Sequence, residues 1–338
     1  MLTLPRFAFL QPVSLEEALA HLAEHGEECL IVAGGTDAVP NLKHRLHEPG
    51  AILHLGRLRE LRYLRDQSDG LEIGSLTTLS EIARDEGVRR DFPSLARAAG
   101  LVAGPQLRNM GTLGGNLCLD TRCTYYNQTY FWRAALGFCL KKDGQVCHVV
   151  PAGKRCVAAH SSDVAPVLIS LEAEVEIATP GRSGLPSTRR RMSVEDFFVP
   201  DGIHNNVLRR DEIVTRVRVP ARSRGLSAGY QKLRPRAAID FPMLSVAFAA
   251  RVGGGACRSA RLVVSAIAAK PRVVSGIEAA LAGRPLDDGA AEAAAQLAHR
   301  QCHPLINVPY DSDYRRAMVP VLVRRAVREA RGEGGGEG

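Results

Sequence analysis

A cluster of cysteines is the feature that most restricts how this 338-residue chain can fold. Five of the eight cysteines lie within less than an eighth of the length: Cys118, Cys123, Cys139, Cys147 and Cys156. Thiolate sulfur is the usual protein ligand of soft metals and of iron–sulfur clusters. The sequence therefore predicts that this stretch folds around a metal centre.

The spacing of these cysteines narrows the kind of centre. It reads C-x4-C-x15-C-x7-C-x8-C and contains no CxxC pair, which most structural zinc sites have. It also differs from the CxxCxxCxxxC run of small ferredoxins. Buried free thiols are a poor explanation for five cysteines at this density. The spacing alone favours an iron–sulfur cluster and leaves zinc as the open alternative.

Composition limits the class of protein. No run of eighteen apolar residues is present, so we expect no transmembrane helix. The N-terminus lacks the long apolar segment of a signal peptide, and we expect a cytoplasmic protein, in which disulfides rarely persist. The net charge of +8 does not indicate nucleic-acid binding, because aromatic residues are only 5% and the arginines are scattered.

Two glycine-rich turns indicate a bound nucleotide. IVAGGTD spans residues 31–37 after an apolar strand, and GTLGGN spans residues 111–116. Consecutive backbone N–H groups in such turns form anion-binding nests, and glycine lets a pyrophosphate approach closely. Neither turn is GxGxxG, so a Rossmann site is not indicated. Asp163 in the SSD motif either contacts a ribose hydroxyl or belongs to a helix cap.

Periodicity predicts an α+β chain rather than a regular doubly wound sheet. Residues 14–26 predict a helix that begins at Ser14 and ends at Gly26. Alternation over residues 213–219 predicts a strand, and residues 245–268 predict a β-hairpin that turns at Gly253–Gly255. Three helices are expected in the C-terminal part, over residues 273–283, 290–302 and 314–330.

The motifs and their order resemble a known family. IVAGGTD, RNMGTLGGNL, SSDVAP, DEIVTRVRVP and YQKLRPRAAIDFPMLSVA follow one another as in the FAD-binding subunit of the xanthine oxidase and carbon monoxide dehydrogenase family. The resemblance implies a two-part FAD-binding domain of the p-cresol methylhydroxylase and vanillyl-alcohol oxidase type over residues 1–224. It also implies an α+β C-terminal domain of the CO dehydrogenase flavoprotein type over residues 225–331. Low complexity predicts a disordered tail over residues 332–338.

The cysteines lie in an insertion relative to most members of that family. This insertion, residues 118–158, resembles the one in the beta subunit of 4-hydroxybenzoyl-CoA reductase, which implies one [4Fe–4S] cluster. On this resemblance the ligands are Cys123, Cys139, Cys147 and Cys156. Cys118 belongs to the NLC segment that follows the parent flavoprotein pattern, and it is assigned as the non-ligand.

The resemblance also implies which residues contact FAD. The first turn provides Ile31, Val32, Ala33, Gly34, Gly35, Thr36 and Asp37. The second nest provides Val102, Ala103, Leu107, Gly111, Thr112, Gly115 and Asn116. Asp163, Val214 and Lys232 complete the expected site, with Lys232 near the isoalloxazine ring. Where xanthine oxidases have consecutive acidic residues, this chain has Ile239–Asp240, which puts NAD use in doubt.

The function implied by the resemblance is electron transfer without substrate chemistry on this chain. The resemblance implies that this chain is a subunit of a molybdenum enzyme, 4-hydroxybenzoyl-CoA reductase. Its partners would be a large subunit with the molybdenum cofactor and a small subunit with two [2Fe–2S] clusters, and the whole enzyme would be a dimer of such heterotrimers. Electrons would pass from ferredoxin to [4Fe–4S], to FAD, to the small subunit and to molybdenum. The alternative is the medium FAD subunit of an oxidative molybdenum hydroxylase. A zinc-binding interaction module is the non-redox alternative.

The insertion is also basic, which bears on the expected donor. Residues 119–157 contain six lysines or arginines and only two aspartates. Such a surface is expected to steer an acidic ferredoxin onto the cluster, with Lys141 and Lys142 as the contacting side chains.

Overall fold

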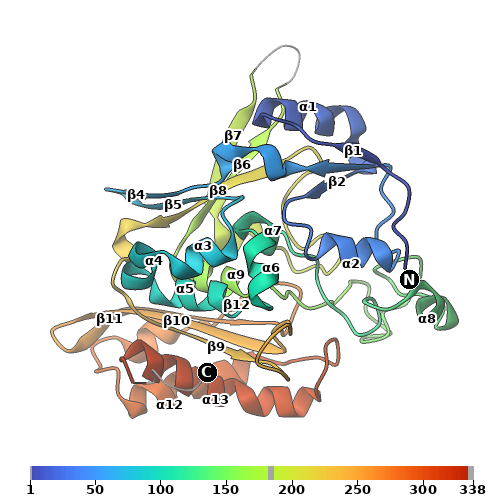
Figure 1. The fold of residues 1–338 in the computed structure, drawn as a ribbon. Coiled ribbons are helices and arrows are strands. Elements are labelled where there is room, and N and C mark those ends of the chain that lie inside the picture. Colours follow the sequence, from blue (N-terminus) through green and yellow to red (C-terminus); the bar gives the residue numbers. More distant parts are fainter. Residues whose placement is uncertain (1, 182–185, 334–338) are drawn as a thin grey trace.

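The computed structural model describes residues 2–181 and 186–333. Within these ranges the chain forms three β-sheets, with helices between them and around them (Figure 1). No helix in the described part is long and apolar enough to cross a membrane. From residue 334 onward, the predicted tail lies outside the described residues.

A small parallel sheet begins the chain. Its strands, in sheet order, are β1 (Ala8–Leu10), β3 (Ala51–His54) and β2 (Cys29–Val32). Helix α1 (Leu15–His25) covers it, and Ser14 caps this helix as predicted, since its Oγ accepts from the Glu17 N–H at 3.2 Å. Leucines spaced three or four residues apart bury one face of α1, so amphipathic spacing fixes how the helix packs.

A five-stranded antiparallel sheet follows. Its strands, in sheet order, are β4 (Leu64–Gln67), β5 (Gly70–Gly74), β8 (Ile213–Pro220), β6 (Glu174–Thr179) and β7 (Thr188–Ser193). The predicted alternation in β8 is confirmed, because Ile213, Thr215, Val217 and Val219 are all buried. The predicted α+β character of this part is also confirmed, since a parallel and an antiparallel sheet occur together.

Short helices surround these two sheets (Figure 1). They are α2 (Ala38–Lys43), α3 (Leu79–Arg84), α4 (Glu86–Asp91), α5 (Pro93–Gly100), α6 (Pro105–Met110), α7 (Leu113–Leu117), α9 (Val164–Ser170) and α10 (Val194–Phe197). Of these, α3 to α7 and α9 lie beneath the five-stranded sheet in Figure 1. Helix α3 begins at a capping box, in which Thr78 accepts from the Glu81 N–H and Glu81 accepts from the Thr78 N–H. Caps of this kind let short helices form where propensity alone would not suffice.

The C-terminal part is an antiparallel sheet with helices on one face. Its strands, in sheet order, are β12 (Arg272–Val273), β11 (Ala256–Ser265), β10 (Leu244–Gly253) and β9 (Ser227–Leu233). Its helices are α11 (Ile277–Leu281), α12 (Asp288–Gln301) and α13 (Ser312–Ala330). The predicted hairpin is therefore β10 with β11, and the three predicted helices are present. The predicted division at residue 224 falls between β8 and β9.

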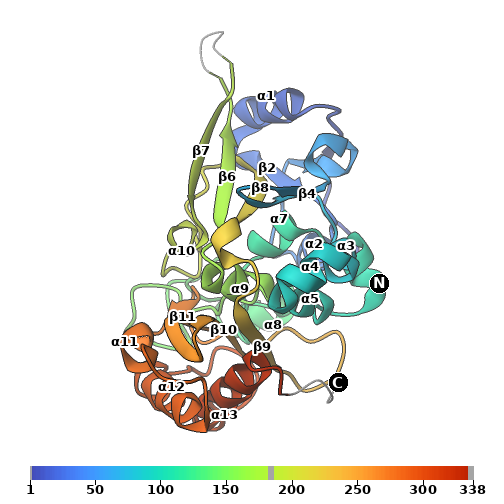
Figure 2. The ribbon, with the colours of Figure 1, turned by 90° about the vertical axis from the view of Figure 1, so that its left-hand side faces the viewer.

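Strand β10 packs on both faces, which explains its nearly continuous apolar sequence. Leu244, Val246 and Phe248 face the core formed with α11 to α13, whereas Ala247 and Ala249 face the core of the first part. Figure 2 shows α12 and α13 on one side of this sheet and α5 and α9 on the other. The two parts therefore share an extensive apolar contact.

Residues 118–158 form an irregular lobe in which α8 (Tyr130–Ala135) is the one helix among the described elements. The lobe lies beside α2 at the edge of the molecule (Figure 1). Its ends meet, because Arg122 and Ala159 exchange two backbone hydrogen bonds of 2.8 and 2.7 Å. The lobe is thus a closed loop attached to the first domain.

Candidate functional site

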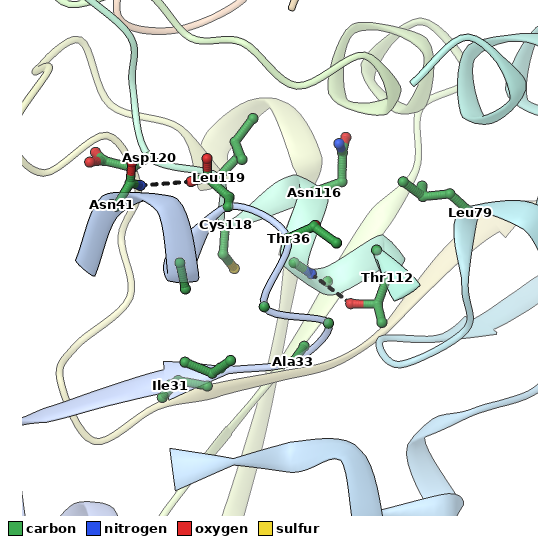
Figure 3. Close-up of a pocket in the computed structure, with 18 of the residues that line it drawn as sticks. Ile31, Ala33, Thr36, Asn41, Leu79, Thr112, Asn116, Cys118, Leu119 and Asp120 are labelled. Carbon is green, nitrogen blue, oxygen red and sulfur yellow. Dashed lines mark hydrogen bonds between the residues drawn. The ribbon is translucent and has the colours of Figure 1, made fainter. Parts of the chain in front are cut away.

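A large cavity of about 410 Å³ lies where the small sheet, the five-stranded sheet and the short helices meet. This volume falls within the usual range for ligand pockets. All the predicted FAD contacts except Lys232 line it. Figure 3 shows Ile31 and Ala33 on one side of the cavity, with Thr112 and Asn116 across from them. The two glycine turns, 80 residues apart in the chain, therefore face one cavity.

The first turn follows β2 and packs directly on the second. A Cβ atom placed on Gly34 would lie 1.9 Å from the carbonyl oxygen of Met110, so no larger residue fits there. Gly35 has a positive φ of 71°, a conformation that glycine adopts without strain. Both glycines are thus required by the backbone geometry that brings the turns together.

The second turn leads into helix α7. The Thr112 hydroxyl accepts from the Gly115 N–H at 3.1 Å and caps the helix. Asn116 accepts from the Ser162 hydroxyl at 2.6 Å, which ties the SSD motif to the turn. The Gly115 backbone is exposed to the cavity. These contacts fix the polar backbone on this wall before any ligand arrives.

Asp163 and Lys232 form a buried ion pair at the wall of the cavity. Asp163 lines the cavity, but its carboxylate accepts from the Tyr230 hydroxyl at 2.7 Å and from the Lys232 ammonium at 2.9 Å. The Lys232 ammonium also donates to the Leu101 carbonyl. Burial raises the pKa of Asp163 and lowers that of Lys232, while their attraction opposes both shifts. Lys232 therefore lies behind the wall of the cavity, in contact with Asp163.

Sequence reasoning missed part of this wall, because the cysteine-containing lobe contributes to it. Cys118, Leu119, Asp120 and Arg122 line the same cavity. Arg122 forms an ion pair with Asp37 of the first turn, and its guanidinium stacks over the Phe241 ring at 4.2 Å. No glycine or strand pattern marks these residues in the sequence. The cavity wall is therefore larger than the set of residues expected from the sequence.

The four predicted ligand cysteines surround a second, small cavity within the lobe. Cys123, Cys139, Cys147 and Cys156 are all buried and line it together with Tyr125, Tyr126, Lys141 and His148. Up to fifteen residues separate one of them from the next in the sequence, and the structure nevertheless brings them to one place. Cys118 is excluded from this group, since it opens into the large cavity, where the surrounding protein desolvates the thiol and raises its pKa to about 12.

Four buried thiols are a donor set that an iron–sulfur cluster uses, and they do not stand close enough together to form a zinc site as they are placed. Four thiolates around one zinc, each about 2.3 Å from the metal, would stand roughly 3.8 Å apart. No three metal-ligating atoms of the lobe's described residues lie within 4.8 Å of one another. The cavity itself measures only about 10 Å³, so the side chains must move outward to admit a cluster. Burial raises the pKa of Cys123 to about 11, so without a metal this thiol stays protonated.

Residues far from the lobe hold the cysteine loops in place. The buried Asn307 side chain donates to the Val157 carbonyl at 2.6 Å, and the Asn307 carbonyl accepts from the Thr124 N–H at 2.8 Å. Gly202 donates to the Cys156 carbonyl at 2.9 Å. A Cβ atom on Gly202 would lie 2.7 Å from the Cys156 sulfur. Only glycine therefore lets the backbone at residue 202 lie this close to the thiol.

Half of the basic side chains of the lobe are internal, which corrects the expected surface contact at Lys141. Lys141 is only 5% exposed and is paired with Asp120, so it cannot contact an external donor. Arg133 is 1% exposed and donates to the Arg45 carbonyl. Of the six basic side chains, Lys142, Lys154 and Arg155 reach the surface, and Lys142 is paired with Asp143. Sequence charge counts could not separate buried from exposed cations.

The fold and the glycine-lined cavity define a flavin-nucleotide-binding subunit, and the comparisons with known proteins agree. The model of the FAD-binding domain in molybdopterin dehydrogenase matches residues 5–222. The model of the CO dehydrogenase flavoprotein C-terminal domain matches residues 229–330. The chain therefore belongs to the FAD-binding medium subunits of the xanthine oxidase and carbon monoxide dehydrogenase family.

Individual relatives cover nearly the whole chain. The carbon monoxide dehydrogenase medium chain of Hydrogenophaga pseudoflava is 27% identical, over 96% of this chain and 97% of that protein. The aldehyde oxidoreductase FAD-binding subunit of Escherichia coli is 31% identical, over 74% of this chain and 78% of that protein. A solved structure of the Hydrogenophaga carbon monoxide dehydrogenase superposes with a TM-score of 0.79, over 98% of this chain and 99% of that one.

Proposed function

We propose that this chain is the electron-transfer subunit of a molybdenum hydroxylase-type oxidoreductase, and that it carries one [4Fe–4S] cluster in addition to FAD. The observation that carries the proposal is the second cavity, lined by four buried cysteines. Proteins of the family share the flavin domain, and the cysteine cavity would extend the electron path by one centre. The chain's own residues would hold both groups and would contact no organic substrate.

The residues of the large cavity have clear roles in holding FAD. Backbone N–H groups of residues 34–36 would bind the pyrophosphate, since such nests favour anions, whereas the N–H groups of residues 114–116 already donate to acceptors within the protein and shape the opposite wall. Arg122 adds a buried positive charge beside the first turn, and burial lowers its pKa to about 10, at which it stays charged at neutral pH. Bound FAD supplies one- and two-electron chemistry, and the protein contributes orientation and electrostatics.

The flow of electrons has two candidate directions. The relatives are subunits of a carbon monoxide dehydrogenase and of an aldehyde oxidoreductase, so an oxidative hydroxylase is the first candidate. In it, electrons would reach FAD from a molybdenum large subunit through a small iron–sulfur subunit. The cysteine cavity favours the second candidate, a reductive 4-hydroxybenzoyl-CoA reductase fed by ferredoxin, because a centre beyond the flavin suits an iron–sulfur donor.

The deciding experiment measures the cofactors first and the direction second. The chain, purified without oxygen in complex with its partner subunits, should contain one FAD and about four iron atoms per copy. Flavin bands with a broad shoulder that dithionite bleaches are expected in the visible spectrum. A colourless preparation, or zinc in place of iron, would refute the proposal. Reduction of the complex by reduced ferredoxin, against its reduction by aldehydes or aromatic heterocycles, separates the two candidates.

A further inference from the structure

A buried ion pair joins the two cavities. Asp120 lines the large cavity, whereas Lys141 lines the cysteine cavity. The Lys141 ammonium lies 2.6 Å from the Asp120 carboxylate, and its side chain is almost fully buried. One ion pair therefore contacts both proposed cofactor sites. Neither the glycine turns nor the spacing of the cysteines predicts this ion pair.

The surroundings hold this lysine in one position. Its ammonium donates to the Thr121 hydroxyl and, at 2.7 Å, to the Gly202 carbonyl, so all three of its protons have partners. The Tyr126 ring faces the ammonium at 4.5 Å, and the Tyr126 hydroxyl donates to Asp120 at 3.0 Å. Gly202 in turn contacts Cys156. The lysine thus belongs to the wall that positions one of the four thiols.

The pair keeps its charges inside the protein. Burial would raise the pKa of Asp120, but Lys141 and His47 lower it to about 2, so the carboxylate is ionised at neutral pH. His47 also lines the large cavity and lies 3.4 Å from Asp120. Buried pairs of this kind often add little to stability, because the desolvation of two charges offsets their attraction. A role in electrostatics is the better explanation for its place between two redox sites.

We propose that Lys141 is a positioning residue that sets how easily the cluster at the four cysteines is reduced, and that Asp120 limits its effect. The inference rests on the proposed [4Fe–4S] site. When such a site accepts one electron from a reduced flavin or a reduced iron–sulfur protein, its negative charge grows by one and no bond changes. A fixed ammonium on the cavity wall stabilises that extra charge. The Asp120 carboxylate opposes it from the flavin side.

Two substitutions with opposite expected signs test the inference. Lys141→Met removes the positive charge and should shift the midpoint potential of the cluster to more negative values. Asp120→Asn removes the negative charge that offsets the ammonium and should shift the potential to more positive values. The potential is measured by anaerobic redox titration with electron paramagnetic resonance, on the complex, with iron and FAD contents determined in parallel. Asp143→Asn, which removes an exposed acid of the same lobe, is the matched control and should shift it least.

The outcomes are distinguishable from those of the proposed function. If the wild-type chain holds iron but both variants have the midpoint potential of the wild type, the inference about Lys141 is wrong and the proposed cluster is unaffected. Shifts in the same direction, or loss of iron from both variants, would show a structural role and also refute it. Absence of iron from the wild-type chain would instead remove the cluster on which the inference depends.

Discussion

The two cavities of this protein are built in opposite ways. The large cavity is lined by turns whose backbone is fixed by helices, strands and caps. The cysteine cavity is lined by irregular loops that form no strands and one helix among the described elements. The first is pre-formed by secondary structure. The second depends on side-chain contacts from distant segments, and metal binding would complete its folding.

The largest expected effect is loss of the metal centre. Cys147→Ser should reduce the iron content from about four atoms to less than about one per chain, because a four-thiolate cluster needs every ligand. Cys118→Ser should keep full iron, since this thiol opens into the other cavity. Iron analysis of both variants, prepared without oxygen, checks the prediction. Full iron in Cys147→Ser would refute the ligand set.

The second prediction tests the large cavity with a single methyl group. Gly34→Ala places a Cβ atom 1.9 Å from the Met110 carbonyl oxygen and should force the two turns apart. Overpacking of this kind costs roughly 1–3 kcal/mol, which corresponds to about five- to 150-fold weaker FAD binding if the whole cost falls on the bound state. FAD content after gel filtration and a titration of the flavin-free protein provide the measurement. Gly100→Ala, with only an ordinary contact at 3.7 Å, is the control and should bind normally.

The third prediction applies the same substitution to the cysteine cavity. Gly202→Ala places a Cβ atom 2.7 Å from the Cys156 sulfur and 2.8 Å from the Ala158 nitrogen. We expect iron content to fall by about half or more, with FAD retained, because the clash lies at one ligand and moves no glycine turn. Loss of FAD together with iron would show that the shared wall couples the two sites more strongly than the structure indicates.

Much of the fold could be predicted from the sequence, because local rules decide it. The cap at Ser14, the alternation in β8 and the β10–β11 turn depend on neighbouring residues, and the structure confirms each of them. The glycine turns were predicted to form one site, and they do line one cavity. These features follow from periodicity and backbone geometry.

The parts that could not be predicted depend on contacts between distant residues. The sequence does not reveal that Gly202 packs on Cys156, or that Asn307 holds the lobe. It suggested that Lys141 is exposed, and this side chain is instead buried in an ion pair with Asp120. The buried ion pair of Lys232 with Asp163 has no local sign in the sequence either. A charged residue gives no local sign of burial, because its partner lies elsewhere in the chain.

The smallest expected effect concerns His160, where the end of the cysteine lobe meets the C-terminal sheet. Its backbone N–H donates to the Ala268 carbonyl at 2.8 Å, and its ring packs edge-on against Phe198 at 4.5 Å. The side chain is fully buried, and its Nε2 has no partner among the described residues. Burial lowers the pKa of His160 from 6.5 to about 3. The folded state therefore keeps this ring neutral in mildly acidic solution, where the unfolded chain takes up a proton.

The sign of the pH effect follows from that difference. Below the unfolded pKa of 6.5 the unfolded state binds more protons than the folded state, so stability falls as the pH is lowered. The free energy of unfolding should drop by about 1 kcal/mol between about pH 7.5 and 5.5, before most carboxylates titrate. His160→Gln should flatten this slope, whereas His303→Gln, at an exposed position, should leave it unchanged. Urea titrations at each pH measure the slope. An equal slope in His160→Gln and the wild type would mean that the loss of stability in acid arises from groups other than His160.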